Sequence, residues 1–457
     1  MKIKRIVFVN PVNRQRGLST TSYTKFKPMA LGVLAGMTPE GIKTEIIDEN
    51  FDIFEQRASQ SGLPDLVGIT AFTPTVARGY EIARYYRERG VPVVMGGIHV
   101  SFFPEEALGY CDSVMIGESE GVWPQILKDA EEGKLKKTYR QELKHDEIKI
   151  GRFHNELFSP DYFWGAVQTS RGCPMDCDFC TVTIFNGFRY RQRPPEEVVE
   201  ELRRIKQKFV FFYDDNVVGR TPEQKKKAVE LFKKITEARL NKYWFCQCSI
   251  NVGEDEEVLK WMYKSGCRMM CVGFESVDTD NLKAMNKMHN LKLIERYPEL
   301  IKRIHRNGIA VLSSFMIGYP YDGEKTAKIL PGFISKTEID AFQLTHLTPF
   351  PGTKLYNRLK EEGKITAMNY PKDWEKYNFS NVVYRHEKLT ADELDSIVRK
   401  IKDRLTLPFL TVAGRCLRTL INTRSLSTAF TAFIWNLGIR QAYINGIKRR
   451  KKEKEMV

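Results

Sequence analysis

The sequence SRGCPMDCDFC, residues 170–180, places three cysteines in a C-x3-C-x2-C spacing directly after an apolar run at residues 164–169. The three are Cys173, Cys177 and Cys180, and thiols this close in one loop face a common centre. Zinc usually takes four protein ligands, and no second CxxC or CxxH pair follows. The motif therefore favours a [4Fe–4S] cluster with one open iron over zinc or three metal-free thiols.

A series of β-type runs and helical stretches extends from this loop toward the C-terminus. Helical patterns at residues 195–208 and 222–238 separate the first of these runs. The six runs are residues 164–169, 210–214, 244–250, 269–274, 311–317 and 342–347. We expect six βα units that form a partial (β/α)6 barrel over residues 164–365, with its site at the carboxyl ends of the strands.

The first 140 residues show a similar alternation, with a helical stretch at residues 77–89. It predicts a Rossmann-like, doubly wound parallel sheet, in which ligands bind beyond the carboxyl ends of the strands. The apolar runs are residues 3–12, 44–48, 66–73, 91–97 and 113–117. Small or hydroxyl residues end these runs and are ligand candidates, although strand-end glycines also simply turn the chain. The polar stretch 141–163 is expected to be a linker.

The composition indicates a globular α/β protein. The chain has 457 residues, of which 42% are hydrophobic and 28% charged, which excludes a disordered or fibrous protein. Mean hydropathy is −0.39, and no apolar run approaches the roughly 18 residues of a membrane span. The opening MKIKRIVFVNPVN is expected to be a first strand of a cytosolic protein rather than a signal peptide. Nine cysteines, an odd number, favour reduced thiols, and Cys246 and Cys248 are expected in the core.

The formal charge of +15 is concentrated near the C-terminus. No acidic residue lies between Asp403 and Glu453, and residues 448–452 are all basic. Apolar and aromatic residues interleave with arginines over residues 405–447. We expect residues 366–457 to be a helical region that contacts an anionic membrane surface, and ordinary helices packed on the barrel are the alternative. A nucleic-acid partner also fits the charge alone.

The cysteine motif, with the aromatic Phe179 before its last cysteine, resembles that of the radical S-adenosylmethionine (SAM) enzymes. The resemblance implies that the three cysteines hold the cluster and that SAM binds the open iron. Reductive cleavage of SAM then gives a 5′-deoxyadenosyl radical. The residues implied as SAM contacts are Phe179, Asp214, Asp215, Ser249 and Glu275. An Asp-Asp-Asn sequence after a strand is also a common helix N-cap, so the two aspartates have a structural alternative.

The N-terminal half resembles the cobalamin-binding domain that is fused to one large radical SAM subclass. The stretches DLVGIT (65–70), VMGGIH (94–99) and IGESE (116–120) carry the resemblance. The D-x-H-x-x-G motif of many B12 proteins is missing. The residues implied as cobalamin contacts are Thr70, Thr73, Gly96, Gly97, His99 and Gly117. For His99, an ordinary hydrogen-bonding role is the alternative.

The pattern as a whole looks like the subgroup of hopanoid C-2 methylases and bacteriochlorophyll methyltransferases. Asp214-Asp215-Asn216, Ser249-Ile250-Asn251 and the stretch WNLGI at residues 435–439 carry this likeness. It implies methylation of an unactivated carbon of a hydrophobic isoprenoid lipid or tetrapyrrole. One SAM would methylate cobalamin and a second would yield the radical, with electrons from a donor such as flavodoxin or ferredoxin. A lipid-related substrate would suit a cytoplasmic protein that is peripheral on the inner face of the membrane.

Two further functions remain open at this point. The same radical could drive cyclisation, carbon–carbon coupling or oxidation of a similar hydrophobic substrate. The third possibility is an RNA-modifying methylthiotransferase or a basic RNA-binding protein, in which the charge of +15 would contact phosphates. Methylthiotransferases usually carry three more N-terminal cysteines, and here that region has only Cys111, so nucleic acid is the less favoured partner. No residue stands out as a separate acid–base catalyst.

Overall fold

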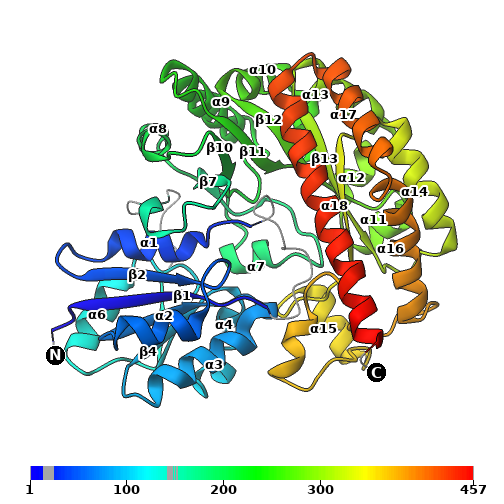
Figure 1. Ribbon diagram of the computed structural model, residues 1–457. Helices are drawn as coiled ribbons and strands as arrows, with labels where there is room; N and C mark the ends of the chain where they lie inside the picture. The colour runs from blue at the N-terminus through cyan, green and yellow to red at the C-terminus, as the bar shows by residue number, and fades with distance from the viewer. Residues whose placement is uncertain (1, 14–24, 142–147, 149, 151–152, 456–457) are drawn as a thin grey trace.

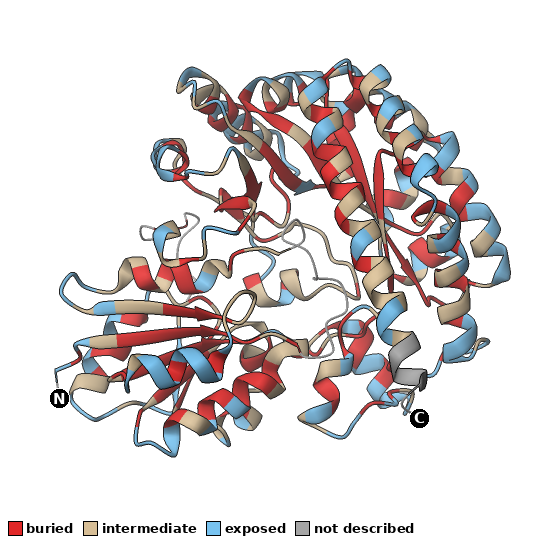
Figure 2. Cartoon of the chain, viewed as in Figure 1, coloured by how far each residue is buried: buried red, intermediate tan, exposed pale blue. Residues whose placement is uncertain are grey.

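Two six-stranded parallel sheets, one from each half of the chain, form the frame of the molecule (Figure 1). The computed structural model describes residues 2–13, 25–141, 148, 150 and 153–455, with side chains described as far as residue 450. The expected linker, residues 141–163, lies partly outside this described part of the chain. Figure 2 shows that the strands of both sheets are largely buried, whereas the covering helices expose one side to solvent.

The N-terminal sheet has the strand order β2-β1-β3-β4-β5-β6, and all of its described pairings are parallel. Its strands are β1 (Arg5–Asn10), β2 (Lys43–Asp48), β3 (Leu66–Thr70), β4 (Val93–Gly96), β5 (Ser113–Ile116) and β6 (Thr138–Arg140). The order reverses between β1 and β3, as in other doubly wound sheets, so a ligand crevice is expected at the carboxyl ends of β1, β3 and β4. The predicted Rossmann-like fold is confirmed.

Helices cover both faces of this sheet. They are α1 (Met29–Met37), α2 (Phe54–Ser61), α3 (Val76–Arg87), α4 (Ile98–Phe102), α5 (Pro104–Leu108) and α6 (Trp123–Glu131). Short 3-10 turns, η2 (Thr73–Thr75) and η3 (Asn155–Leu157), lie in the connections. Strand β3 is buried at every position, because helices lie on both of its sides, and this explains its unbroken apolar sequence LVGIT.

The second sheet has the order β14-β13-β12-β11-β10-β7, again with all described pairings parallel. Its strands are β7 (Trp164–Val167), β10 (Phe209–Phe212), β11 (Tyr243–Cys248), β12 (Cys267–Glu275), β13 (Ala310–Ile317) and β14 (Ala341–His346). Strands β7 and β14 are the two edges, so the six units form the predicted partial barrel. A small antiparallel pair, β8 (Ser170–Arg171) and β9 (Arg191–Gln192), lies beside the cysteine loop.

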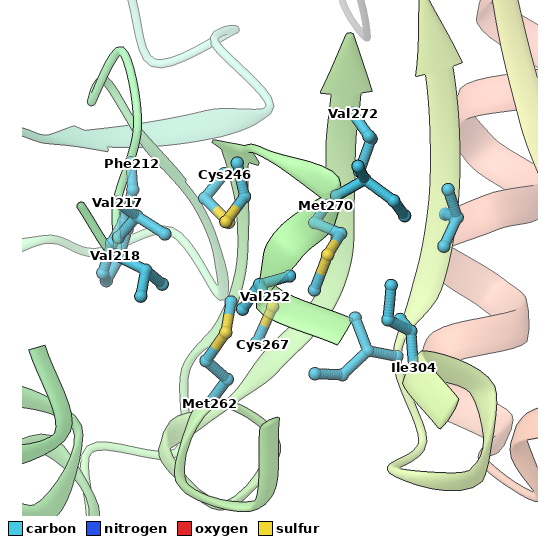
Figure 3. Packing of buried hydrophobic residues seen from close by; sticks show 14 of the residues in the cluster. Phe212, Val217, Val218, Cys246, Val252, Met262, Cys267, Met270, Val272 and Ile304 are labelled. Atoms are coloured by element: carbon cyan, nitrogen blue, oxygen red, sulfur yellow. The ribbon is translucent and has the colours of Figure 1, made fainter. Parts of the chain in front are cut away.

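Helices follow the strands of the barrel, and most of them bury one apolar core against the outer face of the sheet. They are α7 (Thr181–Asn186), α8 (Pro195–Arg204), α9 (Pro222–Glu237), α10 (Glu256–Ser265), α11 (Thr279–Ala284), α12 (Met288–Leu293), α13 (Tyr297–Arg306), α14 (Glu324–Lys336) and α15 (Lys354–Glu361), with 3-10 turns η4 (Ile250–Glu254) and η5 (Ile294–Arg296). Figure 3 shows Cys246 and Cys267 in this core beside Met262 and Met270. Cys246 and Cys248 are buried as expected.

The C-terminal region is helical from residue 391 onward. Its helices are α16 (Ala391–Leu405), α17 (Phe409–Thr423) and α18 (Leu426–Glu455). Residues 366–390 contain the 3-10 turn η6 (Lys372–Lys376) and a β-bridge residue, Tyr384, but no α-helix, so the helices begin later than residue 366. Helix α18 contacts β12, β13 and β14, and it crosses the barrel in Figure 1. Among the described residues, no helix is both long and apolar enough to cross a bilayer.

Part of the sequence expected at a membrane surface instead closes the inner side of the barrel. Ala432 and Trp435 of α18 pack against Trp164, Phe245 and other inward-facing strand residues. Buried Asn436 donates from Nδ2 to the Asp340 carbonyl at 2.8 Å. Together with Phe26, these side chains cover the inner apolar face of the open barrel, and they are buried for that reason. Other apolar residues of the same region, described below, stay exposed.

Candidate active site

The cysteine loop opens onto a cavity of about 600 Å³ at the carboxyl ends of the barrel strands. Cys173, Cys177 and Cys180 all line it. Burial raises the pKa of all three thiols, that of Cys177 to about 11 and that of Cys180 to about 12. Within the described residues, no three side chains of Cys, His, Asp or Glu are close enough to share a single metal ion. An iron–sulfur cluster is larger than one ion and separates its thiolate ligands.

Asp214 anchors the strand that leads into the cysteine loop. Its carboxylate is fully buried and accepts hydrogen bonds from the Thr169 backbone N–H (2.7 Å), the Thr169 hydroxyl (2.8 Å) and the Ser170 backbone N–H. Asp214 does not line the cavity, so the structure does not bring it together with the other predicted SAM contacts. The physical reason is that its side chain points back to β7, where three donors need an acceptor. Burial raises the pKa of Asp214 to about 6.

Further contacts hold the loop itself. Gly172 donates its backbone N–H to Asp215 at 3.0 Å. Gly172 has φ +88, and a Cβ there would lie 1.8 Å from the Arg189 carbonyl oxygen, so only glycine fits before the first cysteine. Asp178 accepts a hydrogen bond from the Tyr319 hydroxyl at 2.6 Å, which ties the loop to the end of β13. The thiols are therefore presented by a loop that is fixed at both ends.

Four of the five predicted SAM contacts line the cavity: Phe179, Asp215, Ser249 and Glu275. They come from the cysteine loop and from the ends of β10, β11 and β12. Ser249 accepts a hydrogen bond from the Asn216 side chain at 3.2 Å. Burial raises the pKa of the Asp215 carboxyl group. Carboxylates and a hydroxyl on one enclosed wall suit a ligand with ammonium and hydroxyl groups.

Glu275 forms an ion pair with Lys287, with Oε1 and Nζ 2.8 Å apart. Glu275 has φ 63 and lies at an irregularity in the pairing of β12 with β13, which aims its side chain into the cavity. A Cβ on Gly273 would lie 2.3 Å from the Glu275 carboxylate and 3.0 Å from Lys287 Nζ. Burial alone lowers the pKa of Lys287, but the Glu275 carboxylate raises it above its ordinary value. Sequence reasoning missed Lys287, because no motif surrounds it.

A second cavity of about 270 Å³ lies at the strand ends of the N-terminal sheet. Four of the predicted cobalamin contacts line it: Thr70, Gly96, Gly97 and Gly117. Its walls are largely apolar and include Leu34, Val94, Met115 and the exposed ring of Phe72. A Cβ added at Gly117 would meet no described atom within 4 Å, so the strand end leaves open space.

Two predicted cobalamin contacts, Thr73 and His99, do not line this cavity. His99 is fully buried, with Nδ1 3.2 Å from the Thr73 hydroxyl and Nε2 3.3 Å from a Glu106 oxygen. Its ring also packs edge-on against Trp374, with centroids 4.9 Å apart. The chain turns into α4 directly after Gly97, which carries His99 away from the strand end. The structure thus places His99 among hydrogen-bonding partners and apart from the other predicted cobalamin contacts.

The two cavities adjoin, since Asp215 and Val182 line both of them. An ion-pair network joins the two halves of the chain beside this shared wall. Glu118 pairs with Arg171 at 3.0 Å and also with Arg191, and Arg171 further pairs with Glu120. The GESE sequence after β5 thus holds the β8–β9 pair next to the N-terminal sheet.

Comparison with known proteins identifies the family. Residues 167–330 match the model of the Radical SAM superfamily, and residues 16–127 match that of the B12 binding domain. The bacteriochlorophyllide d C-8(2)-methyltransferase of Chlorobaculum tepidum is 30% identical over 425 residues, which cover 88% of this chain and 90% of that protein. The chain belongs to the radical SAM superfamily and carries a B12-binding domain.

A further relative and a solved structure agree with this family assignment of the radical SAM enzyme. The hopanoid C-2 methylase of Rhodopseudomonas palustris is 27% identical over 351 residues, covering 74% of this chain and 65% of that protein. A solved structure of the radical SAM methyltransferase TsrM from Kitasatospora setae, with cobalamin and a [4Fe–4S] cluster bound, matches with a TM-score of 0.63. It has 17% sequence identity and covers 92% of this chain and 91% of TsrM, so it supports the fold.

The cofactors of this enzyme are a [4Fe–4S] cluster, SAM and cobalamin. The residues present are suited to them. Three thiols on one cavity wall are the donor set of a site-differentiated cluster. The second cavity offers apolar walls and a glycine-lined edge, where a flat macrocycle can approach the backbone closely.

Proposed function

We propose that this enzyme is a cobalamin-dependent methyltransferase that methylates an unactivated carbon of a hydrophobic tetrapyrrole or isoprenoid. The observation that carries the proposal is the wall of Asp215 and Val182 shared by the two cavities. A methyl donor on one side and a radical source on the other must reach the same carbon, so their sites must adjoin. The substrate class is supported by the names of two relatives, a bacteriochlorophyllide d methyltransferase and a hopanoid C-2 methylase.

The proposal gives each lining residue a role. Cys173, Cys177 and Cys180 hold the cluster; Phe179, Asp215, Ser249 and the Glu275–Lys287 pair hold SAM; Thr70, Gly96, Gly97 and Gly117 border the cobalamin. When bound, the cluster with SAM supplies a 5′-deoxyadenosyl radical, and the cobalamin supplies a methyl group. An external one-electron donor such as flavodoxin or ferredoxin is part of the proposal, because reductive cleavage of SAM consumes an electron.

The chain's own contribution is to position and to shield. Asp214 and Asp178 fix the cysteine loop, and the apolar side chains of Met316, Phe350 and Phe179 exclude water from the cavity. A radical held among such side chains is protected from side reactions. The proposed domains are residues 1–140, 141–163, 164–365 and 366–457; in support, the N-terminal sheet ends at Arg140 and α15 at Glu361.

Product mass tests the function. The enzyme, purified anaerobically with cluster and cobalamin, is incubated with SAM, a reductant and a tetrapyrrole or hopanoid acceptor. We expect 5′-deoxyadenosine, S-adenosylhomocysteine and a product heavier by one CH2 unit. A product lighter by two hydrogen atoms would contradict the proposal and indicate cyclisation or oxidation. The Cys177→Ala variant, which removes one cluster ligand, is the control. It should form neither 5′-deoxyadenosine nor S-adenosylhomocysteine.

We also propose that the enzyme docks on an anionic membrane surface through α17 and the start of α18. Large apolar side chains remain 50% to 84% exposed there, which is unusual for a surface without a partner. They are Phe409, Leu410, Leu417, Ile421, Leu426 and Phe430. Leu410, Leu417 and Ile421 recur at helical spacing, so they lie on one face of α17.

Positive charge beside this apolar face supports a lipid partner. A cavity next to Ile421 is lined by Lys302, Arg306 and Arg424, with Glu338 as its acidic member. No acidic residue occurs from residue 404 to 452. Apolar side chains flanked by basic ones match the acyl and headgroup layers of an anionic bilayer. This location would give the enzyme access to a membrane-derived substrate.

A further inference from the structure

The charged side chains around the larger cavity are paired on one side and unpaired on another. Asp176 pairs with Lys354 at 2.6 Å, and Glu275 pairs with Lys287 at 2.8 Å. Arg220 and Lys292 also line this cavity. Within the part of the chain that the structure describes, neither has an ion pair or a side-chain hydrogen bond. Asp215 also lines the cavity, and the nearby Glu254 is paired with Arg296 at 2.6 Å, so neither Arg220 nor Lys292 has an ion-pair partner of its own among the described residues of this wall.

His289 lies with these two cations. It is three residues before Lys292 on α12, so the two side chains share a face of the helix. Burial lowers the pKa of His289, and the nearby cations, Arg220 among them, lower it further, while the Glu254 carboxylate raises it in part. Its Nε2 is buried and has no hydrogen-bond partner among the described residues. A buried ring nitrogen without a partner at a cavity wall is costly unless a ligand satisfies it.

The mouth of the same cavity also has an apolar part. Met288 and Phe379 are 45% and 40% exposed, and Phe379 packs edge-on against Phe350 with ring centroids 5.0 Å apart. A ligand that covers these side chains and also reaches the cationic wall must be hydrophobic with an anionic end. A purely hydrocarbon ligand would leave Arg220 and Lys292 without an ion-pair partner.

SAM carries a carboxylate of its own, but another cation is better placed for it. Lys287 lies close enough to Cys173 and Cys177 to affect the pKa of both thiols. Its Nζ is also 5.7 Å from the ring centroid of Phe179, within the cysteine loop. Arg220 and Lys292 reach the cavity from outside this loop, from the segment before α9 and from α12. Lys287 is thus the cation beside the cluster, and the other two are left for a second anion.

We propose that Arg220, His289 and Lys292 bind a carboxylate of the substrate. A guanidinium and an ammonium donate charge-assisted hydrogen bonds to a carboxylate, and the neutral imidazole adds a further N–H. The substrate class is then a hydrophobic acid, such as a tetrapyrrole with free acid side chains, and not a neutral isoprenoid hydrocarbon. This inference rests on the proposed function only in taking the larger cavity as the substrate site.

Equilibrium binding tests this without turnover. The cluster-loaded enzyme with SAM is titrated with protoporphyrin IX and, separately, with its dimethyl ester, and the quenching of tryptophan fluorescence is followed. We expect the free acid to bind at least about tenfold more tightly than the ester. Arg220→Gln and Lys292→Gln should each weaken binding of the acid about tenfold and remove the preference over the ester. Lys328→Gln, with the same charge change on the exposed face of α14, is the matched control.

Each other outcome is decisive. Equal binding of acid and ester by the unchanged enzyme would overturn the inference. Weaker SAM binding in Arg220→Gln and Lys292→Gln, with porphyrin binding unchanged, would also overturn it and assign the wall to SAM. Binding of a neutral hopene in place of either porphyrin would overturn the inference but leave the proposed methyl transfer intact. If acid binding behaves as expected but the enzyme forms no 5′-deoxyadenosine with reductant, the proposed function fails and the inference stands.

Discussion

Asp214 and Asp215 are adjacent in sequence and have different roles. Asp214 faces β7 and accepts three hydrogen bonds, whereas Asp215 faces the cavities. We expect Asp214→Ala to destabilise the cluster-free protein by about 1–3 kcal/mol, because three buried donors lose their acceptor. Thermal unfolding measures this effect. Asp215→Asn should leave the unfolding temperature nearly unchanged and weaken SAM binding; the reverse pattern would contradict these roles.

A second prediction at this scale concerns Gly273. An alanine there would push the Glu275 carboxylate and Lys287 apart, since its Cβ would lie 2.3 Å from the carboxylate. We expect Gly273→Ala to weaken SAM binding about tenfold or more while the cluster still assembles. Equilibrium dialysis with SAM and iron quantitation on the same sample separate the two effects. Unchanged SAM affinity would exclude the Glu275–Lys287 pair from the SAM site.

The sequence motif predicted the cysteines, and eight of the eleven other predicted site residues line the two cavities. The alternation that marks a strand end does not give the direction of each side chain, so Asp214 could not be separated from Asp215. The same limit applies to His99, which follows a cavity-lining glycine but turns inward with α4. Arg220 and Lys287 lie in connections and His289 on the short helix α12, none of them within a motif, and they come to the cavity only through the tertiary fold.

Among the elements, the buried parallel strands were predicted best. Their continuous apolar runs end where the strands end, to within a few residues, because both faces are covered. Strand β6 was missed, since it is only TYR and its outer residues are exposed. The apolar sequence after residue 405 was ambiguous. In the structure, its apolar residues lie partly on the buried face of α18 and partly on the exposed face of α17. Periodicity alone does not show which apolar helix face packs against the barrel.

Helix α17 and its neighbours are joined to the barrel by buried Asp340. It accepts hydrogen bonds from His305 Nε2 (2.7 Å), the Val311 backbone N–H (2.7 Å) and the Thr419 hydroxyl (2.6 Å). Burial alone would lower the pKa of His305, but the Asp340 carboxylate outweighs it and raises the pKa above its ordinary value. The folded protein therefore holds this proton more tightly than the unfolded chain.

The stability that this ion pair adds is complete below the ordinary histidine pKa of about 6.5 and is lost as pH rises through the raised value. We expect His305→Gln to lower the unfolding free energy by about 3 kcal/mol at pH 6, and by less at alkaline pH. Thermal unfolding across this pH range measures the difference. His154→Gln, which removes a more exposed histidine paired with Glu156, is the control. A loss that does not depend on pH would contradict a charged His305.

At the scale of the whole molecule, the N-terminal sheet and the barrel must keep their relative position for the two cavities to adjoin. The pairs of Glu118 with Arg171 and Arg191 join positions far apart in sequence, so sequence patterns could not predict them. We expect Glu118→Gln to leave iron loading unchanged and to reduce methyl transfer more than formation of 5′-deoxyadenosine. Comparable losses of both products would show that the network does not control how the two sites meet.

Membrane docking belongs to the same scale. We expect the double variant Leu417→Glu/Ile421→Glu to lose most of its sedimentation with vesicles of phosphatidylglycerol at low salt, because acidic groups would enter the apolar layer. Ile329→Glu also places a glutamate at an exposed apolar residue, which lies on α14 and is 51% exposed. This variant should sediment with the vesicles as the unchanged enzyme does. Equal binding of both variants would remove α17 from the interface. Concentration-dependent dimerisation that only the double variant loses would instead indicate a second copy on this face.

Iron, sulfide and cobalt quantitation on one anaerobic sample, from cells supplied with cobalamin, tests the proposed methyltransferase most directly. The two adjoining cavities predict about four irons and one cobalt per chain. The Cys177→Ala variant should lose the iron and keep the cobalt, since the two sites lie in different halves of the chain. Four irons without cobalt in the unchanged enzyme would contradict the methyltransferase and favour a radical reaction that needs no methyl carrier.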